Sequence, residues 1–194
     1  GLGVAPRMII IKSRSDVSGW AVYQADVGNT KYLRLDGTDV ANTASTLWNN
    51  TSPTSTVFSV GTDGWVNGSA RTYVAYAFAD VAGYSKFGSY TGNGSTDGPF
   101  VFTGFRPAYV MFKRTDVAND WVINDATRSA YNQTINVLYA NDSAAENTTG
   151  AGNSIDILSN GFKLRQTNNG SNASGGTYIF MAFASAPQKF ALAQ

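Results

Sequence analysis

Two tryptophans in polar surroundings are the residues of this chain whose type and spacing best fit ligand binding. Trp48 lies in the segment TLWNNTSPT and Trp65 lies in TDGWVNGS. An indole stacks on the apolar face of a sugar ring, while amide and carboxylate groups beside it bind the hydroxyls. The sequence therefore gives one candidate glycan-binding set, formed by Trp48, Asn49, Asn50, Asp63 and Trp65.

A structural role is the favoured interpretation of the same two tryptophans. Neither has a counterpart in the second half of the chain. Indoles at such positions also cap the end of a β-sandwich or pack against a neighbouring subunit. In that case the Asn and Asp residues beside them only form turns.

Carboxylates offer a second kind of chemistry. A glycoside hydrolase needs two carboxyl groups about 5 to 10 Å apart. Asp36 with Asp39, or Asp116 with Asp120 and Asp125, could supply such a pair. Asp beside Gly or Asn is, however, ordinary turn chemistry. We therefore expect a protein that is not an enzyme and has no catalytic residues.

Histidine and cysteine are both absent from the chain. Their absence excludes catalytic triads with a histidine base, zinc sites built from His or Cys, and disulfides. The segments Leu35–Asp39 and Ser95–Pro99 lack the ligand spacing of a calcium loop. We expect no cofactor and no metal site, with an isolated surface calcium left open.

Charge and hydropathy argue against two classes of partner. The net charge is +1, and no basic run is longer than Lys113-Arg114, so nucleic-acid binding is not expected. No apolar run reaches about 18 residues, the length that a transmembrane helix needs. We therefore expect no nucleic acid as partner and no membrane insertion.

The two halves of the chain share a repeated pattern. The first half contains PRMIIIKSRSDVSGWAVY, and the second contains PAYVMFKRTDVANDWVIN. At one offset of 101 residues, the matched pairs are Pro6 and Pro107, Lys12 and Lys113, and Trp20 and Trp121. Because a tryptophan present in both copies is best explained by packing, we expect Trp20 and Trp121 to lie in the core.

A second pair of segments extends the repeat. TYVAYAFA at residues 72–79 matches TYIFMAFA at residues 177–184, at an offset of 105, so the second copy has about four more residues. Lys86-Phe87 likewise matches Lys189-Phe190. Order, spacing and residue type agree, which predicts a tandem duplication.

The predicted units are residues 1–88 and 89–194. The lead-in Phe87–Pro107 of the second unit has only a short counterpart, GLGVAP, in the first. We therefore expect the first strand of unit one to be missing upstream or to be supplied by another segment. The chain is accordingly expected to be cut from a longer protein or processed. Residues that the two halves share are expected to serve the fold. We therefore expect functional residues among those that have no match, which are Trp48, Trp65 and the region Asn132–Asn153.

Short strands separated by turn residues account for most of the chain. The expected strands include RMIIIKSR, AYVMFKRT, WAVYQAD, KYLRLDG, STVFSVG, GFKLRQT and FVFTGF, bounded by clusters of Gly, Asn, Asp and Pro. No window of about 12 residues has helical periodicity, although Ala126–Ala145 could hold a helical turn. The pattern predicts an all-β fold, an antiparallel β-sandwich of jelly-roll-like type in two tandem units.

Four stretches of this sequence carry a resemblance to a known kind of domain. They are GLGVAPRMIIIKSRS with GWAVY, TKYLRLDG with STLWNNTSPTSTVFSVG, the long stretch Val66–Asp116, which runs across both loops and strands, and DILSNGFKLR with NASGGTYIFMAFA. The chain resembles an uncharacterised duplicated β repeat domain of bacteriophage fibre-like and other virion structural proteins, mainly from phages of marine bacteria. The resemblance covers essentially the whole chain and implies no established catalytic residues.

The resemblance implies a virion structural or adhesive role. We therefore expect a non-enzymatic tail-fibre or appendage module, on the extracellular surface of the particle, that acts in assembly and host-surface adhesion. Its expected partners are other virion proteins, copies of itself in a homo-oligomer (a trimer in the case of a fibre), and a host surface glycan. A capsid decoration protein and a stand-alone carbohydrate-binding module are the alternatives.

Overall fold

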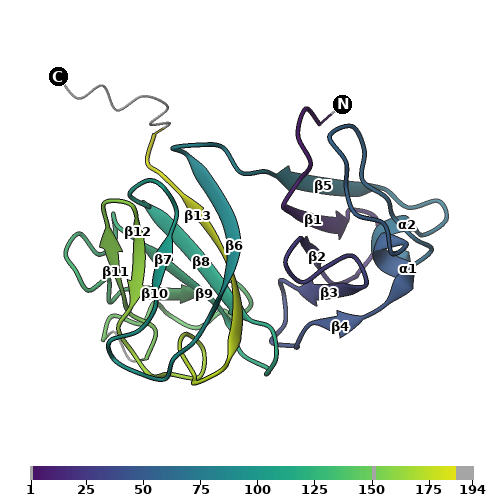
Figure 1. Cartoon of the computed structure of the whole chain (residues 1–194). Coiled ribbons are helices and arrows are strands. Elements are labelled where there is room, and N and C mark those ends of the chain that lie inside the picture. Colours follow the sequence, from purple (N-terminus) through teal and green to yellow (C-terminus); the bar gives the residue numbers. More distant parts are fainter. Residues whose placement is uncertain (1, 150–151, 187–194) are drawn as a thin grey trace. The chain divides into compact units, whose positions relative to one another are not determined.

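The structure is a computed structural model that describes residues 2–149 and 152–186 (Figure 1). Within them the chain is nearly all β, with 13 strands in three antiparallel sheets and two helices of one turn each. This confirms the predicted all-β, antiparallel class. The chain divides into two compact units, Gly1–Ala79 and Asp80–Gln194.

The boundary between the units lies before the predicted position at 88/89. Strand β6 (Ser85–Thr91) pairs along its whole length with β13 (Thr177–Phe183) of the second unit. A division after residue 88 would therefore cut through a paired strand. The structural division after Ala79 keeps β6 with its partner.

The first unit is one five-stranded sheet in the order β4-β3-β2-β1-β5. Its strands are β1 (Met8–Ser13), β2 (Ala21–Gln24), β3 (Lys31–Arg34), β4 (Asn42–Thr43) and β5 (Tyr73–Phe78). One face of the sheet is covered by the helical turns α1 (Ser45–Trp48) and α2 (Gly64–Asn67), not by a second sheet (Figure 1). The segment STVFSVG, expected as a strand, forms none.

The core of the first unit explains this cover. It contains Ile9, Ile11, Ala21, Tyr23, Leu47, Trp48 and Val66. The first four residues come from one face of β1 and β2, and the last three come from the two helical turns. Four-residue helices are too short to give a periodic pattern, which is why the sequence does not predict them.

The second unit is a sandwich of two antiparallel sheets. Its larger sheet has the order β10-β9-β8-β13-β6 and its smaller sheet the order β11-β12-β7 (Figure 1). The remaining strands are β7 (Phe100–Phe102), β8 (Tyr109–Arg114), β9 (Trp121–Asp125), β10 (Val137–Tyr139), β11 (Ile155–Leu158) and β12 (Gly161–Leu164). Side chains of both sheets, such as Phe112, Phe162 and Phe180, meet in one buried core. The helical turn predicted within Ala126–Ala145 is wrong, because that segment holds β10 and turns.

Four strands of each unit occur in the same order and register. The order β3-β2-β1-β5 corresponds to β10-β9-β8-β13. Met8 of β1 lies opposite Phe78 of β5, and the equivalent Tyr109 of β8 lies opposite Phe183 of β13. The pairing of β1 with β2 matches that of β8 with β9 in the same way. An internal duplication predicts this arrangement, and the duplication itself stays a prediction from the sequence.

The repeated TY dipeptide anchors the same loop in both units. The hydroxyl of Tyr73 donates to the carbonyl of Gly64 (2.7 Å) and accepts from the N–H of Gly68 (2.6 Å). The hydroxyl of Tyr178 makes the equivalent bonds to the carbonyl of Asn169 (2.8 Å) and the N–H of Ala173 (2.9 Å). Each tyrosine thus fixes the loop that leads into its own strand.

The contribution of this anchor is measurable in the second unit, where Tyr178 is fully buried. We expect Tyr178→Phe to lower the free energy of unfolding by about 1 to 2 kcal/mol, because two backbone groups lose their partner. Urea unfolding followed by circular dichroism measures the loss. Tyr131→Phe is the control, since that side chain is 86% exposed. Equal stability of both variants would show that the hydroxyl of Tyr178 does not hold the loop.

Candidate functional site

The ring of Trp48 is part of the core and offers no face to a ligand. Its side chain is only 1% exposed and packs edge-on against Tyr23, with ring centroids 5.7 Å apart. The indole N–H has no hydrogen-bond partner among the described residues. Trp48 therefore belongs to the fold, and its place in the predicted glycan-binding set is wrong.

The two asparagines after Trp48 end helix α1. Asn49 and Asn50 both have positive φ, 51° and 48°, in the left-handed region that Asn tolerates better than most residues. Both side chains are exposed. The amide-rich composition that suggested a sugar site is thus explained by the geometry of a helix end.

The other members of the set also have structural contacts. The Asp63 carboxylate caps α2 by accepting from the N–H of Trp65 (2.9 Å). The half-buried ring of Trp65 packs edge-on against Tyr32, and the guanidinium of Arg34 lies 5.3 Å from the ring centroid. The members of the set that a ligand could still reach are Asn49, Asn50 and the accessible part of Trp65. Glycan binding by them stays a prediction.

The candidate acidic residues are held by cations or amides. Asp36 and Asp39 both contact Arg34, at 3.5 and 3.4 Å. Asp125 pairs with Arg128 at 2.8 Å, and Asp120 accepts from the amide of Asn141 at 2.8 Å. In the described ranges, no group of three or more acidic residues is placed to hold a metal ion. These contacts give the carboxylates structural roles at turns and loop ends.

Asp116 forms an ion pair with the buried Arg114 in the second unit. Their atoms lie 2.8 Å apart, and the guanidinium also donates to the side-chain oxygen of Asn169 (2.7 Å). The hydrogen bond from Arg114 lowers the pKa of Asp116 to about 2. Because Arg114 reaches the loop that Tyr178 anchors, this pair reinforces the loop.

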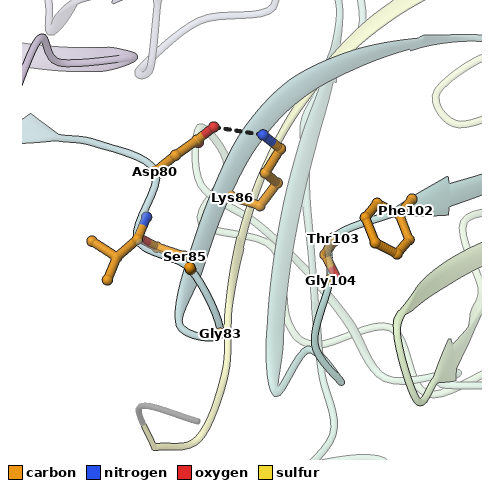
Figure 2. Close-up of a pocket in the computed structure, with 9 residues that line it drawn as sticks. Asp80, Gly83, Ser85, Lys86, Phe102, Thr103 and Gly104 are labelled. Atoms are coloured by element: carbon orange, nitrogen blue, oxygen red, sulfur yellow. Dashed lines mark hydrogen bonds and ion pairs between the residues drawn. The ribbon is translucent and has the colours of Figure 1, made fainter. Parts of the chain in front are cut away.

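An open hollow in the second unit brings together groups suited to binding. It measures about 380 Å³ and is lined by the turn Asp80–Lys86 and by Phe102–Gly104. Figure 2 shows the Asp80–Lys86 ion pair (2.6 Å) on one side and the ring of Phe102 on the other. Phe102 is 62% exposed. An exposed ring beside charged hydrogen-bonding groups fits a sugar or a polar protein surface.

Sequence reasoning missed Phe102, although the alternation of FVFTGF contains the signal. Val101 is buried, so Phe100 and Phe102 point to the opposite side of β7. Alternation alone does not tell which face of a strand is covered. Two exposed aromatic side chains on one short edge strand are nevertheless unusual and mark this surface as a candidate.

A second hollow lies in the loop between β9 and β10. It is lined by residues from Thr127 to Asn136, including the exposed Tyr131. The four-residue difference between the two offsets falls here, since β9 matches β2 at an offset of 101 and β10 matches β3 at 105. The amide of Asn132 ties the loop to Ile157 through two hydrogen bonds, of 2.9 and 3.0 Å. This hollow covers part of the region Asn132–Asn153, of which residues 150–151 lie outside the described part.

Comparison with known proteins identifies one matching family. Residues 1–187 match the family described as a domain of unknown function, DUF7483. No curated protein and no solved structure matches the chain. No helix in the described part of the chain is long and apolar enough to cross a membrane.

A core role for Trp48 makes a prediction that a sugar-stacking role does not. We expect Trp48→Ala to lower the free energy of unfolding by about 3 to 5 kcal/mol, the usual cost of emptying a buried indole site. Trp48→Phe should cost much less, because it keeps a ring and removes the unpaired N–H. Denaturant unfolding of both variants checks this. An alanine variant as stable as the parent chain would contradict a core position for Trp48.

Proposed function

Because the chain belongs to the DUF7483 family, whose function is unknown, we propose its role from its own sequence and architecture. We propose that it is a non-enzymatic bacteriophage virion protein, a tail-fibre or appendage module that acts in assembly and host-surface adhesion. The resemblance to phage repeat domains supports the virion setting. The outer edge of β5, on which no strand of the described residues pairs, supports assembly and is the observation that carries the proposal.

Among the described residues, strand β5 has a neighbouring strand on one edge only. It pairs with β1 and stands last in the order of its sheet. The N–H of Arg14 donates to the carbonyl of Thr72 (2.8 Å), which sets the alternation along the strand. Backbone groups of alternate residues point to opposite edges in an antiparallel pair. Those of Ala75 and Ala77 therefore point away from β1.

The equivalent strand of the second unit shows what a completed edge looks like. β13 lies between β8 and β6 and is buried over most of its length. Tyr76 of β5 is 47% exposed, whereas the equivalent Met181 of β13 is 6% exposed. Among the described residues, the same sequence pattern is thus paired on both edges in one unit and on one edge in the other.

An open edge with exposed side chains is a template for strand addition. A strand from a virion protein or from another copy would bind the outward N–H and carbonyl groups of β5. Such pairing needs no catalytic group and no metal. It gives a homo-oligomer or a mixed assembly, and three copies related by a threefold axis would form a fibre.

We propose that the hollow beside Phe102 is the surface that acts in adhesion. The exposed ring offers a stacking surface, and the charged groups of Asp80 and Lys86 stand across from it (Figure 2). Surface polysaccharides present both an apolar ring face and hydroxyl groups, which these residues match.

The assembly arm is tested at Ala75. Ala75→Pro removes an outward N–H without removing a bond to β1, so the fold is retained while pairing on the open edge is blocked. We expect this variant to be monomeric where the parent chain associates, as measured by sedimentation velocity over a range of concentrations. Ala75→Val, which keeps the N–H, is the matched control and should associate. Association that survives the proline would remove the β5 edge from the assembly mechanism.

The adhesion arm is tested at Phe102. We expect Phe102→Ala to weaken binding to host cells about tenfold, the effect of losing about 1.4 kcal/mol. Its stability should change little, because the ring is largely exposed. Flow cytometry with labelled protein measures the binding. Tyr131→Ala, at the other hollow, is the control, and equal binding by both variants contradicts a site at Phe102.

A further inference from the structure

We propose that the second unit has a weak calcium site formed by the side-chain oxygens of Asn119, Asn153 and Asn168. Asn119 lies in the loop between β8 and β9, Asn153 lies two residues before β11, and Asn168 lies in the loop between β12 and β13. The inference is independent of the proposed virion role, because it rests only on the contacts of these side chains.

The three oxygens gather around Gly170, which is itself buried. A Cβ at this position would lie 3.0 Å from Oδ1 of Asn153, 3.2 Å from Oδ1 of Asn168 and 3.3 Å from Oδ1 of Asn119. The three oxygens therefore surround the space that a side chain of residue 170 would fill. Calcium binds oxygen at about 2.3 to 2.6 Å, so small movements of the three amides would bring them to an ion in that space.

The Oδ1 atom of Asn153 is the observation that points to a ligand. Asn153 is 6% exposed, and this oxygen has no hydrogen-bond donor within the described part of the chain. The side-chain amide of the same residue donates to the hydroxyl of Tyr139 (3.3 Å), which turns Oδ1 away from that hydroxyl. Because a buried carbonyl without a partner is costly, a ligand that contacts this oxygen is favoured.

The oxygen of Asn168 is held in place beside Gly170. It accepts from the N–H of Gly170 (2.7 Å), and its second lone pair can contact a further group. The backbone carbonyl of Asn168 accepts from the N–H groups of Ser171 (3.1 Å) and Asn172 (2.8 Å). This turn fixes the loop, so the oxygen of Asn168 is positioned before any ligand binds.

The chemistry of the three groups selects the ligand. Amide oxygens are hydrogen-bond acceptors and hard ligands, so the group that fits among them is a hard cation. Calcium takes six to eight oxygens, including Asn carbonyls and waters, in a flexible geometry, whereas magnesium requires a nearly ideal octahedron. Oxygens from three irregular loops fit calcium better. Because none of them carries a charge, we expect a dissociation constant of about 1 mM, at the weak end of calcium sites.

The charges nearby are compatible with a cation. Asp120 follows Asn119 directly in the chain, and its carboxylate is bonded to the neutral amide of Asn141 (2.8 Å). The guanidinium of Arg114 bonds Asn169 in the loop that contains Gly170, but its charge is offset by the ion pair with Asp116. The carboxylate of Asp120 therefore adds negative charge to this end of the unit.

A bound ion would join three loops of the sandwich. The hydroxyl of Ser171 already donates to the carbonyl of Gly152 (2.9 Å), which links the β12–β13 loop to the segment before β11. Asn119 would bring in the β8–β9 loop as well. The site would thus make the stability of this end of the unit depend on calcium.

Binding is tested by NMR titration of the ¹⁵N-labelled full chain, freed of metal with a chelator, with calcium chloride. We expect the side-chain amide signals of the three asparagines to shift together and to saturate with a dissociation constant of about 1 mM. Magnesium chloride at equal ionic strength is the control and should not produce these shifts. An Asn153 amide turned the other way would satisfy the neighbouring oxygens without an ion. The absence of a saturable calcium shift, or an equal shift with magnesium, therefore overturns the site.

Two substitutions at Asn119 test the ligand set. Asn119→Ala removes one oxygen and should weaken calcium binding about tenfold. Asn119→Asp adds a charge and should strengthen it about tenfold, since ligand charge tunes calcium affinity. Asn160→Ala, at an exposed asparagine in the turn between β11 and β12, is the matched control and should bind as the parent does. Equal affinity of the parent and Asn119→Ala overturns the assignment.

Gly170→Ala tests the position of the ion. Its Cβ occupies the space among the three oxygens. Calcium at ten times its dissociation constant should raise the folding equilibrium constant of the parent about tenfold, as measured by urea unfolding. The same addition should have no effect on Gly170→Ala. An equal response of both chains overturns the position, and Asn119→Ala supplies the same comparison in the event that Gly170→Ala does not fold.

Discussion

A β-strand carries hydrogen-bonding groups on two edges, and most of this structure follows from how those edges are paired. β13 is paired on both sides and buried, while the only strand of the described residues that pairs with β5, of nearly the same sequence, is β1. The difference does not come from the strand itself. It comes from which segment of the chain pairs with the outer edge of each strand, because β6 follows β5 in the sequence but pairs with β13.

The loops before these two strands show how one geometry is kept with different residues. In both units a tyrosine hydroxyl bridges a carbonyl and an N–H of the loop. The same carbonyl also accepts from an arginine, which is Arg71 in the first unit and Arg114 in the second. These arginines are not at equivalent positions in the repeat. The position of the loop is therefore fixed by the hydrogen bonds to its carbonyl, and an arginine at either sequence position can donate one of them.

The sequence predicted the all-β class and most of the strands that it names, because short apolar runs between turn residues mark them, whereas STVFSVG forms no strand. It did not predict the cover of the first unit. Leu47 and Val66 enter the core from helical turns of four residues, which are too short to show a period of 3.6. The polar neighbours of Trp48 were misleading for a related reason, since Asn49 and Asn50 satisfy the backbone of a helix end. Phe102 was missed because strand alternation separates two faces without telling which one meets the core.

In the first unit, different bonds set the register of β5 and the position of the loop before it. The register of β5 against β1 is set by backbone pairing, while the entry of the preceding loop is set by the hydroxyl of Tyr73. Between Thr43 and Gly64, Leu47 and Trp48 enter the core, Phe58 and Val60 pack against it, and residues 54–57 are exposed. The exposed residues 54–57 can therefore change in composition while β5 keeps its register on β1. The surface displayed at this tip is in that way independent of the pairing of the strand.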